Sequence, residues 1–130
     1  MSLILDTSIL IRLQKGDSVV KKELELLSKR FPATPSITFI NTFEYLIGIR
    51  LWTKRKTDAI KFLENFNIVN TTEKTPETMS SLKLKYDKEG KVFSLSDLII
   101  ASLSIENGMV LVTSDSDFKN IKELKLEFIG

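Results

Sequence analysis

The sequence contains no cysteine and no histidine among its 130 residues. The first absence excludes disulfides and thiolate metal sites, and the second excludes imidazole as a metal ligand or a proton carrier. Any bound metal must therefore have oxygen ligands. Carboxylates and carbonyls favour magnesium, manganese or calcium.

A long hydrophobic run is also lacking. The apolar start of the chain is interrupted at Asp6, well short of a signal peptide or a spanning helix. We therefore expect a cytoplasmic protein with no membrane contact. The formal net charge of +2 is compatible with a polyanionic partner but is common in proteins that bind none.

Length and composition predict one domain over residues 1–130. A chain of this length can bury one sizeable core and is too short for two independent ones. Hydrophobic residues make up 42% and charged residues 28%, which separates the chain from disordered proteins and membrane spans.

Short apolar runs alternate with segments of helical spacing. The runs predict strands at 3–5, 36–38, 68–69, 110–112 and 126–129, and a short helix is expected at 117–124. The strands look too apolar to face water on either side, which indicates a sheet covered on both faces. The predicted fold class is α/β, with three α/β/α layers around a central, mainly parallel sheet of four to five strands.

Acidic residues follow the predicted strands. Asp6 comes after the first strand, and Asp115 and Asp117 come after the fourth. Glu44 lies in the helix after the second strand, and Asp97 opens the helix before the fourth. Open parallel sheets bind ligands beyond the carboxyl ends of their strands, so these five side chains can meet there.

Each aspartate also has an ordinary structural interpretation, and taken singly that interpretation is the commoner one. Asp6 can cap a helix, and Asp97 forms a capping box with Ser94. Asp115 and Asp117 can be turn or cap residues.

Glu44 is harder to explain in this way. Its helical neighbours Ile40, Ile47 and Gly48 form a largely apolar strip that we expect to face the interior. A buried carboxylate requires a compensating cation. The alternative is a position at the helix edge from which the carboxylate reaches water.

Several carboxylates in one place repel one another unless cations neutralise them, so such a cluster predicts a metal site. Magnesium leaves coordination positions open for phosphate oxygens and water, and two ions can together hydrolyse a phosphodiester. Hydroxyl groups are placed to orient the carboxylates, although each can equally be an ordinary turn or cap hydroxyl; they belong to Thr7, Ser8, Thr113 and Ser114.

Basic and aromatic residues offer a surface for single-stranded RNA, because cations bind phosphates and aromatic rings stack on unpaired bases. The candidates for substrate binding are Arg50, Lys54, Arg55 and Lys85, with Trp52 and Tyr86 as the rings. The alternative is a solvated helix face.

Four ordered motifs resemble the PIN-domain nucleases, and within them the VapC toxins of prokaryotic toxin–antitoxin pairs. The motifs are 4–8, 37–48, 97–101 with Gly108, and 112–118. The resemblance covers nearly the whole chain. It implies a parallel α/β sheet, magnesium- or manganese-dependent endoribonuclease activity, homodimerisation, and inhibition by an antitoxin whose tail fills the active-site groove.

The resemblance also implies the roles of the acidic residues. Asp6, Glu44, Asp97 and Asp115 take the catalytic and metal-binding roles, and Asp117 is an auxiliary metal ligand. Two alternatives keep the PIN fold, namely an RNA-processing nuclease without a toxin role and an inactive RNA-binding module. A phosphoacceptor receiver domain fits poorly, because receivers carry adjacent acids after the first strand and a lysine after the last.

Overall fold

The fold is built on a five-stranded sheet in which all paired strands are parallel. This computed structural model describes the backbone of residues 1–52 and 56–130 and the side chains of residues 1–49 and 57–130. The strand order is β3-β2-β1-β4-β5. The strands are β1 (Leu3–Leu5), β2 (Ser36–Thr38), β3 (Asn67–Val69), β4 (Val110–Thr113) and β5 (Lys125–Phe128).

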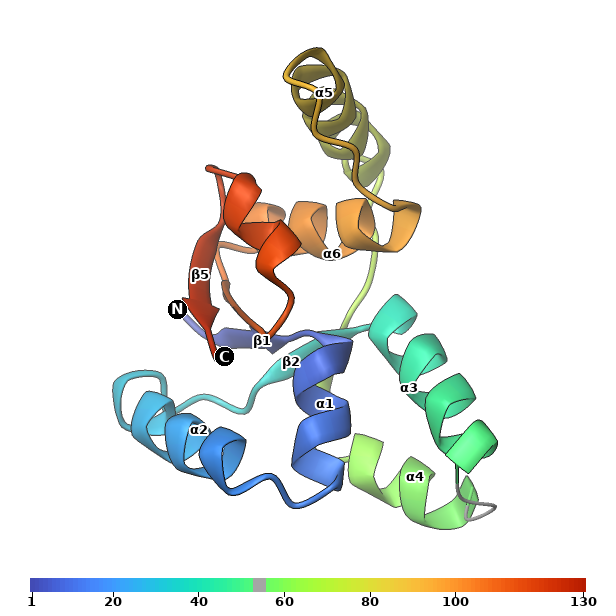
Figure 1. The fold of residues 1–130 in the computed structure, drawn as a ribbon, viewed down its shortest axis with the longest axis vertical. Coiled ribbons are helices and arrows are strands. Elements are labelled where there is room, and N and C mark those ends of the chain that lie inside the picture. The colour runs from blue at the N-terminus through green and yellow to red at the C-terminus, as the bar shows by residue number, and fades with distance from the viewer. Residues whose placement is uncertain (53–55) are drawn as a thin grey trace.

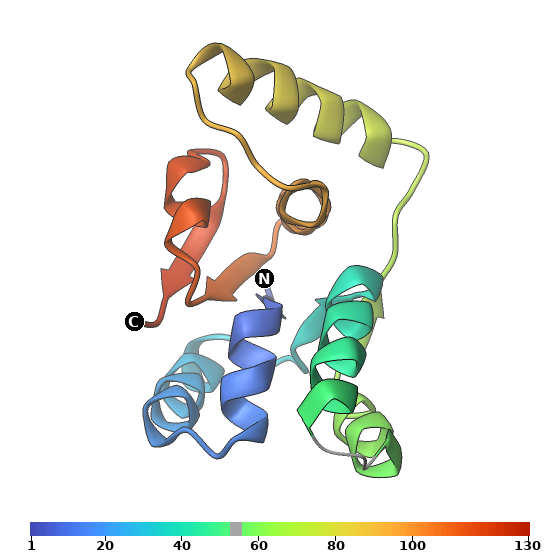
Figure 2. The ribbon, with the colours of Figure 1, turned by 45° about the vertical axis from the view of Figure 1, so that its right-hand side comes forward.

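Helices cover both faces of the sheet, as the sequence predicts. They are α1 (Thr7–Gln14), α2 (Ser18–Arg30), α3 (Phe39–Trp52), α4 (Lys56–Leu63), α5 (Thr75–Lys88) and α6 (Leu95–Glu106), with a 3-10 helix η1 (Ser116–Asn120). In Figure 1, α1, α2 and α4 lie on one side of the sheet, and α5 and α6 lie on the other; Figure 2 shows the same separation. The predicted three-layer α/β/α architecture is confirmed.

The alternation of side chains along the central strands creates two cores. Leu3 and Leu5 pack on the side of α1 to α4, whereas Ile4 between them packs on the side of α5 and α6. Val110 and Leu111 divide in the same way. This follows from strand geometry, in which successive side chains point to opposite faces.

The outer strands differ from expectation. β1 and β4 are buried throughout, but Asn67 and Ile68 of β3 and Lys125 of β5 are exposed. The prediction that every strand is buried on both faces is therefore wrong for the two edges. The helix predicted at 117–124 is also shorter, because only 116–120 forms a 3-10 helix.

The strand order brings two distant parts of the chain together. The chain runs outward from β1 through β2 to β3, and then returns to place β4 on the other side of β1. Such a reversal opens a crevice at the carboxyl ends of the two central strands. Leu5 pairs with Val112, so Asp6 and Thr113 are level at that edge.

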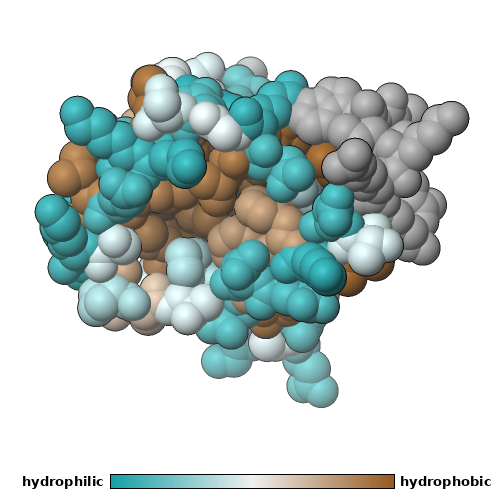
Figure 3. Space-filling model, turned by 90° about the horizontal axis from the view of Figure 1, so that it is seen from below, coloured by the Kyte–Doolittle hydropathy of each residue, from teal (hydrophilic) through white to brown (hydrophobic). Residues whose placement is uncertain are grey.

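The face formed by α1, α2 and α4 has an apolar hollow surrounded by hydrophilic side chains (Figure 3). Two apolar pockets flank α1 here. Ile11, Gly48 and Ile49 line one, and Leu13 and Leu24 line the other. Among the described helices, none has both the length and the apolar character needed to cross a bilayer.

Candidate metal centre

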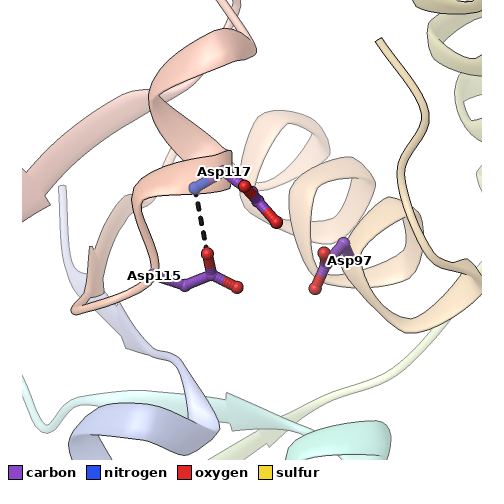
Figure 4. Close-up of side chains that lie close together, drawn as sticks. All are labelled: Asp97, Asp115 and Asp117. Carbon is purple, nitrogen blue, oxygen red and sulfur yellow. Dashed lines mark hydrogen bonds between the residues drawn. The ribbon is translucent and has the colours of Figure 1, made fainter.

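Three aspartate carboxylates converge beyond the carboxyl end of β4. Asp97 lies in the first turn of α6, Asp115 follows β4, and Asp117 lies in η1. One carboxylate oxygen from each lies within 4.8 Å of the others. Figure 4 shows the three side chains pointing into the same space. Segments almost twenty residues apart thus meet at the edge predicted from the sequence.

Asp6 is buried beside this group, and its side chain does not cap α1. Its Oδ2 instead accepts hydrogen bonds from Thr113 Oγ1 at 2.8 Å and Ser8 Oγ at 2.9 Å. Burial is the largest influence on the pKa of Asp6 and raises it, the hydroxyl hydrogen bonds lower it, and the charge of Asp115 raises it further. The simple capping interpretation of Asp6 is therefore wrong.

The aspartates interact electrostatically. Burial, followed by the charge of Asp115, raises the pKa of Asp97 to about 6, and the charges of Asp6 and Asp117 contribute in the same direction. A carboxyl group whose pKa is raised by neighbouring carboxylates is one that a bound cation would stabilise in its charged form.

Glu44 lies on the Asp6 side and is not part of the three-aspartate group. Its Oε1 accepts a hydrogen bond from Thr7 Oγ1 at 2.8 Å. Thr7 Oγ1 in turn accepts one from Asn41 Nδ2 at 3.0 Å. The strip predicted to face the interior lies at the helix edge, because Ile47 is 45% exposed. Glu44 is only half-buried, and a hydroxyl group compensates its charge in part.

The four predicted hydroxyl residues take part in two networks: Thr7 in that of Glu44, and Ser8, Thr113 and Ser114 in one around Asp6. Thr113 Oγ1 accepts from the Asp115 amide at 3.0 Å while donating to Asp6. Ser8 Oγ accepts from the Ser114 amide at 3.1 Å while donating to Asp6. The loop carrying Asp115 is therefore tied to the end of β1.

Two of the three converging aspartates also take part in helix caps. Asp115 Oδ1 accepts from the Asp117 amide at 2.9 Å, which is a cap of η1. Ser94 caps α6 by accepting from the Asp97 amide at 3.2 Å, which confirms half of the predicted capping box. A capping role consequently does not argue against a site role here.

Two residues that support these hydroxyl groups, Asn41 and Arg12, were not anticipated from the sequence. Asn41 Oδ1 accepts from the amide and the hydroxyl of Thr38, and its amide group supports Thr7. The spacing of three residues between Thr38 and Asn41 is a local capping signal. Arg12 hydrogen-bonds Ser114, 102 positions away, and no local pattern indicates such a contact.

The predicted RNA-binding surface is only partly described. Lys85 forms an ion pair with Glu123 at 3.3 Å and lies over the Tyr86 ring. Tyr86 is fully buried, so the prediction that it stacks on bases is wrong. The side chains of Arg50 and Trp52 and the residues Lys54 and Arg55 lie outside the described part of the chain.

The donor set fits a hard divalent cation. Oxygens bound to one ion at about 2.0–2.6 Å lie at most about 5 Å apart, and carboxylates are the ligands that magnesium and manganese prefer. The three aspartates meet both conditions. Burial, followed by the negative charges of Asp115, Asp6 and Asp117, raises the pKa of Asp97, and those charges add an electrostatic reason for a cation at this place.

The fold and the candidate site together describe a parallel α/β domain with acidic side chains gathered at one edge of its sheet. The sequence matches the PIN domain family over residues 3–124, and the chain belongs to that family. It is 30% identical over 132 residues to Ribonuclease VapC2 of Rickettsia felis, covering 98% of this chain and 97% of the relative.

Solved structures agree with this assignment. The fold matches VapBC2 from Rickettsia felis, bound to a promoter DNA fragment, with a TM-score of 0.85, 27% identity and full coverage of both chains. A toxin–antitoxin complex from Klebsiella pneumoniae matches with a TM-score of 0.78, 27% identity and 95% coverage of each chain. VapBC-1 from nontypeable Haemophilus influenzae has the same fold, with a TM-score of 0.82, 22% identity and 98% coverage of each chain.

Proposed function

We propose that this protein is a divalent-metal-dependent endoribonuclease and the toxin of a VapBC-type toxin–antitoxin pair. The observation that carries the proposal is the gathering of Asp97, Asp115 and Asp117 beside the buried Asp6. The relative named Ribonuclease VapC2 supports RNA as the substrate, and we expect it to be single-stranded.

The proposed ions are magnesium or manganese, held by Asp97, Asp115 and Asp117 together with Asp6 and Glu44. Bound ions of this kind lower the pKa of a water molecule and neutralise charge on the scissile phosphate. Thr113 and Ser8 hold the Asp6 carboxylate in one orientation, and Thr7 does the same for Glu44. The chain supplies no histidine for proton transfer, and carboxylates and water are the groups that the proposed site offers for acid–base work.

Partners form the second part of the proposal. VapBC complexes among the structural relatives support a cognate antitoxin as a partner. We propose that its tail covers the acidic edge. We also propose a cytoplasmic homodimer. Phe39, Phe43 and Ile47 support an interface, because these exposed residues follow one another at four-residue intervals along α3.

Substitution of the aspartates tests the nuclease proposal. We expect Asp97→Asn and Asp6→Asn each to lower RNA cleavage by more than about 100-fold, since ligand loss should exceed the 10- to 100-fold cost of losing a supporting contact. A fluorescent single-stranded RNA assay with Mg²⁺ measures the effect. Asp87→Asn is the matched control, because this exposed carboxylate pairs with Lys83 on α5.

Full cleavage by both variants would refute the nuclease proposal, and absence of cleavage by the wild type would favour the inactive RNA-binding module. The toxin role has a separate test. A short upstream reading frame encoding a DNA-binding protein, whose product binds this chain and stops cleavage, is expected. Cleavage without such a partner gene would favour the RNA-processing nuclease.

A further inference from the structure

Arg12 joins three chain segments at the base of the loop that carries Asp115. Its Nε donates to Asp17 Oδ2 at 2.9 Å, and its Nη1 donates to Ser114 Oγ at 2.8 Å. Nη1 also lies 2.9 Å from the Gly130 carbonyl oxygen and 3.3 Å from that of Ile129. The partners are up to 118 positions away, so this guanidinium fixes tertiary structure rather than a local turn.

The geometry of a guanidinium suits this task. Its donors lie in one rigid plane, so anchoring one edge determines where the other edge points. Asp17 is a firm anchor, because its other oxygen caps α2 by accepting from the amides of Val19 and Val20. The Arg12 hydrogen bond lowers the pKa of Asp17 and keeps its carboxylate charged.

The contact with Ser114 leads directly to the metal centre. The Ser114 amide donates to Ser8 Oγ, which donates to Asp6, and the next residue along the chain is Asp115. The neighbouring strand contributes as well, because the Ile129 amide donates to the Thr113 carbonyl at 2.9 Å. Arg12 therefore holds the site loop through both the Ser114 side chain and the chain segment beside Thr113.

Arg12 makes no hydrogen bond to any of the proposed metal ligands in the described part of the structure. Its charge is directed to Asp17, and its contact with the loop is made through a neutral hydroxyl. Direct neutralisation of the aspartates is thus not its role. What the contact determines is the position of Ser114, and with it the approach of the Asp115 carboxylate to Asp97.

We propose that Arg12 is a positioning residue of the metal centre, which holds Ser114 so that the Asp115 carboxylate stays close to that of Asp97, where the two would hold a cation. This inference rests on the proposed metal-dependent function. Losing a supporting contact of this kind typically costs about 10- to 100-fold in metal affinity.

Mn²⁺ binding to the full chain tests the inference, measured by electron paramagnetic resonance of free Mn²⁺. We expect Arg12→Met to weaken binding by about tenfold or more, and Ser114→Ala to weaken it several-fold. The double variant should be little worse than Arg12→Met alone, because both changes break one chain of contacts. Arg12→Lys should recover only part of the affinity, because an ammonium group lacks the planar fork.

Arg30→Met is the matched control. Arg30 also links α2 to the β5 strand, through Glu127 at 3.4 Å, but it is 65% exposed and does not touch the site loop. Its Mn²⁺ affinity should equal that of the wild type. Higher Mn²⁺ concentration should restore much of the RNA cleavage of Arg12→Met, which a general folding defect would not allow.

The outcomes separate this inference from the proposed function. Suppose that the wild type and Arg30→Met bind Mn²⁺ and cleave RNA, and that Ser114→Ala binds Mn²⁺ as tightly as they do. This result would overturn the proposed role of Arg12 and leave the proposed nuclease function standing. Additive losses in the double variant would also overturn it. If Arg12→Met fails to fold, Ser114→Ala still decides, because it removes only a hydroxyl. A wild type that neither binds Mn²⁺ nor cleaves RNA would overturn both proposals.

Discussion

The two sides of the acidic edge are held in different ways. Asp6 and Glu44 each accept hydroxyl hydrogen bonds that orient their carboxylates. On the other side, Asp97, Asp115 and Asp117 bring carboxylate oxygens within 4.8 Å of one another, and the pKa of Asp97 is raised to about 6. Hydroxyl hydrogen bonds therefore orient the two carboxylates on one side, whereas close approach of carboxylates characterises the three aspartates on the other.

Among the experiments that test this difference between the two sides, removal of divalent metal should have the largest effect on cleavage and stability. With excess EDTA we expect RNA cleavage to cease, and with Mn²⁺ at 100 times its dissociation constant we expect about 2.7 kcal/mol of stabilisation. That gain corresponds to a rise in melting temperature on the order of 10 °C. Differential scanning fluorimetry measures the rise.

The rise should nearly disappear in Asp97→Asn and remain in Thr7→Val, because only the first variant alters the three-aspartate group. An equal rise in both variants and the wild type would mean that the metal binds elsewhere.

Removal of a hydroxyl group should have the next largest effect on metal affinity and cleavage, and the effect should differ between Thr113 and Thr7. Thr113 contacts both sides of the acidic edge, since its hydroxyl donates to Asp6 and accepts from the Asp115 amide. Thr113→Val keeps the shape and should lower Mn²⁺ affinity and cleavage about tenfold or more. The loss in the free energy of unfolding should be about 1–3 kcal/mol, because the position is fully buried.

Thr7→Val removes a hydroxyl that donates to Glu44 alone, so its effect on cleavage should be smaller. Calorimetric Mn²⁺ titration and urea unfolding of the two variants give the comparison. A larger effect of Thr7→Val would show that Glu44 matters more to the centre than the Asp6–Asp115 link.

The pH dependence of stability should show the smallest effect. The pKa of Asp97 is about 6 in the folded protein against an ordinary value of 3.8, so between these values the folded state binds more protons than the unfolded state. Stability of the metal-free protein is therefore lost as pH rises from about 4 to 6, and the loss is complete above that range. Because Asp97 is partly exposed, we expect it to amount to about 1 kcal/mol.

Asp97→Asn should remove this loss and stabilise the metal-free protein at pH 7.5 but not at pH 4.5. Urea unfolding in EDTA at the two pH values measures the difference. An equal effect of the substitution at both pH values would mean that the raised pKa of Asp97 is not its cause.

The general plan of the site follows from the sequence. Apolar runs predict the strands, and parallel pairing places their carboxyl ends at one edge, where Asp6 and Asp115 can meet. That β4 lies directly beside β1 comes from the structure. Strand burial is less predictable, because a short run such as that of β3 does not indicate whether it becomes an edge.

Side-chain partners that are distant in sequence could not be predicted. Helical periodicity suggests that Glu44 faces the interior, but the position of α3 relative to α1 determines that it meets Thr7. Tyr86 has the character of a base-stacking ring, yet packing against Phe93 and a contact with Glu123 bury it. The contacts of Arg12 could not be predicted either, since its long-range partners in the described structure lie after residue 113.

The position of β1 between β2 and β4 has a consequence for how the protein is made. The strand that precedes Asp6 is synthesised more than a hundred residues before its neighbour β4 and the loop bearing Asp115. Pairing between segments so far apart forms late and slowly in folding. If Asp115 and Asp117 hold the metal as proposed, a nascent chain should not cleave RNA until residues up to Asp117 have been added and have docked.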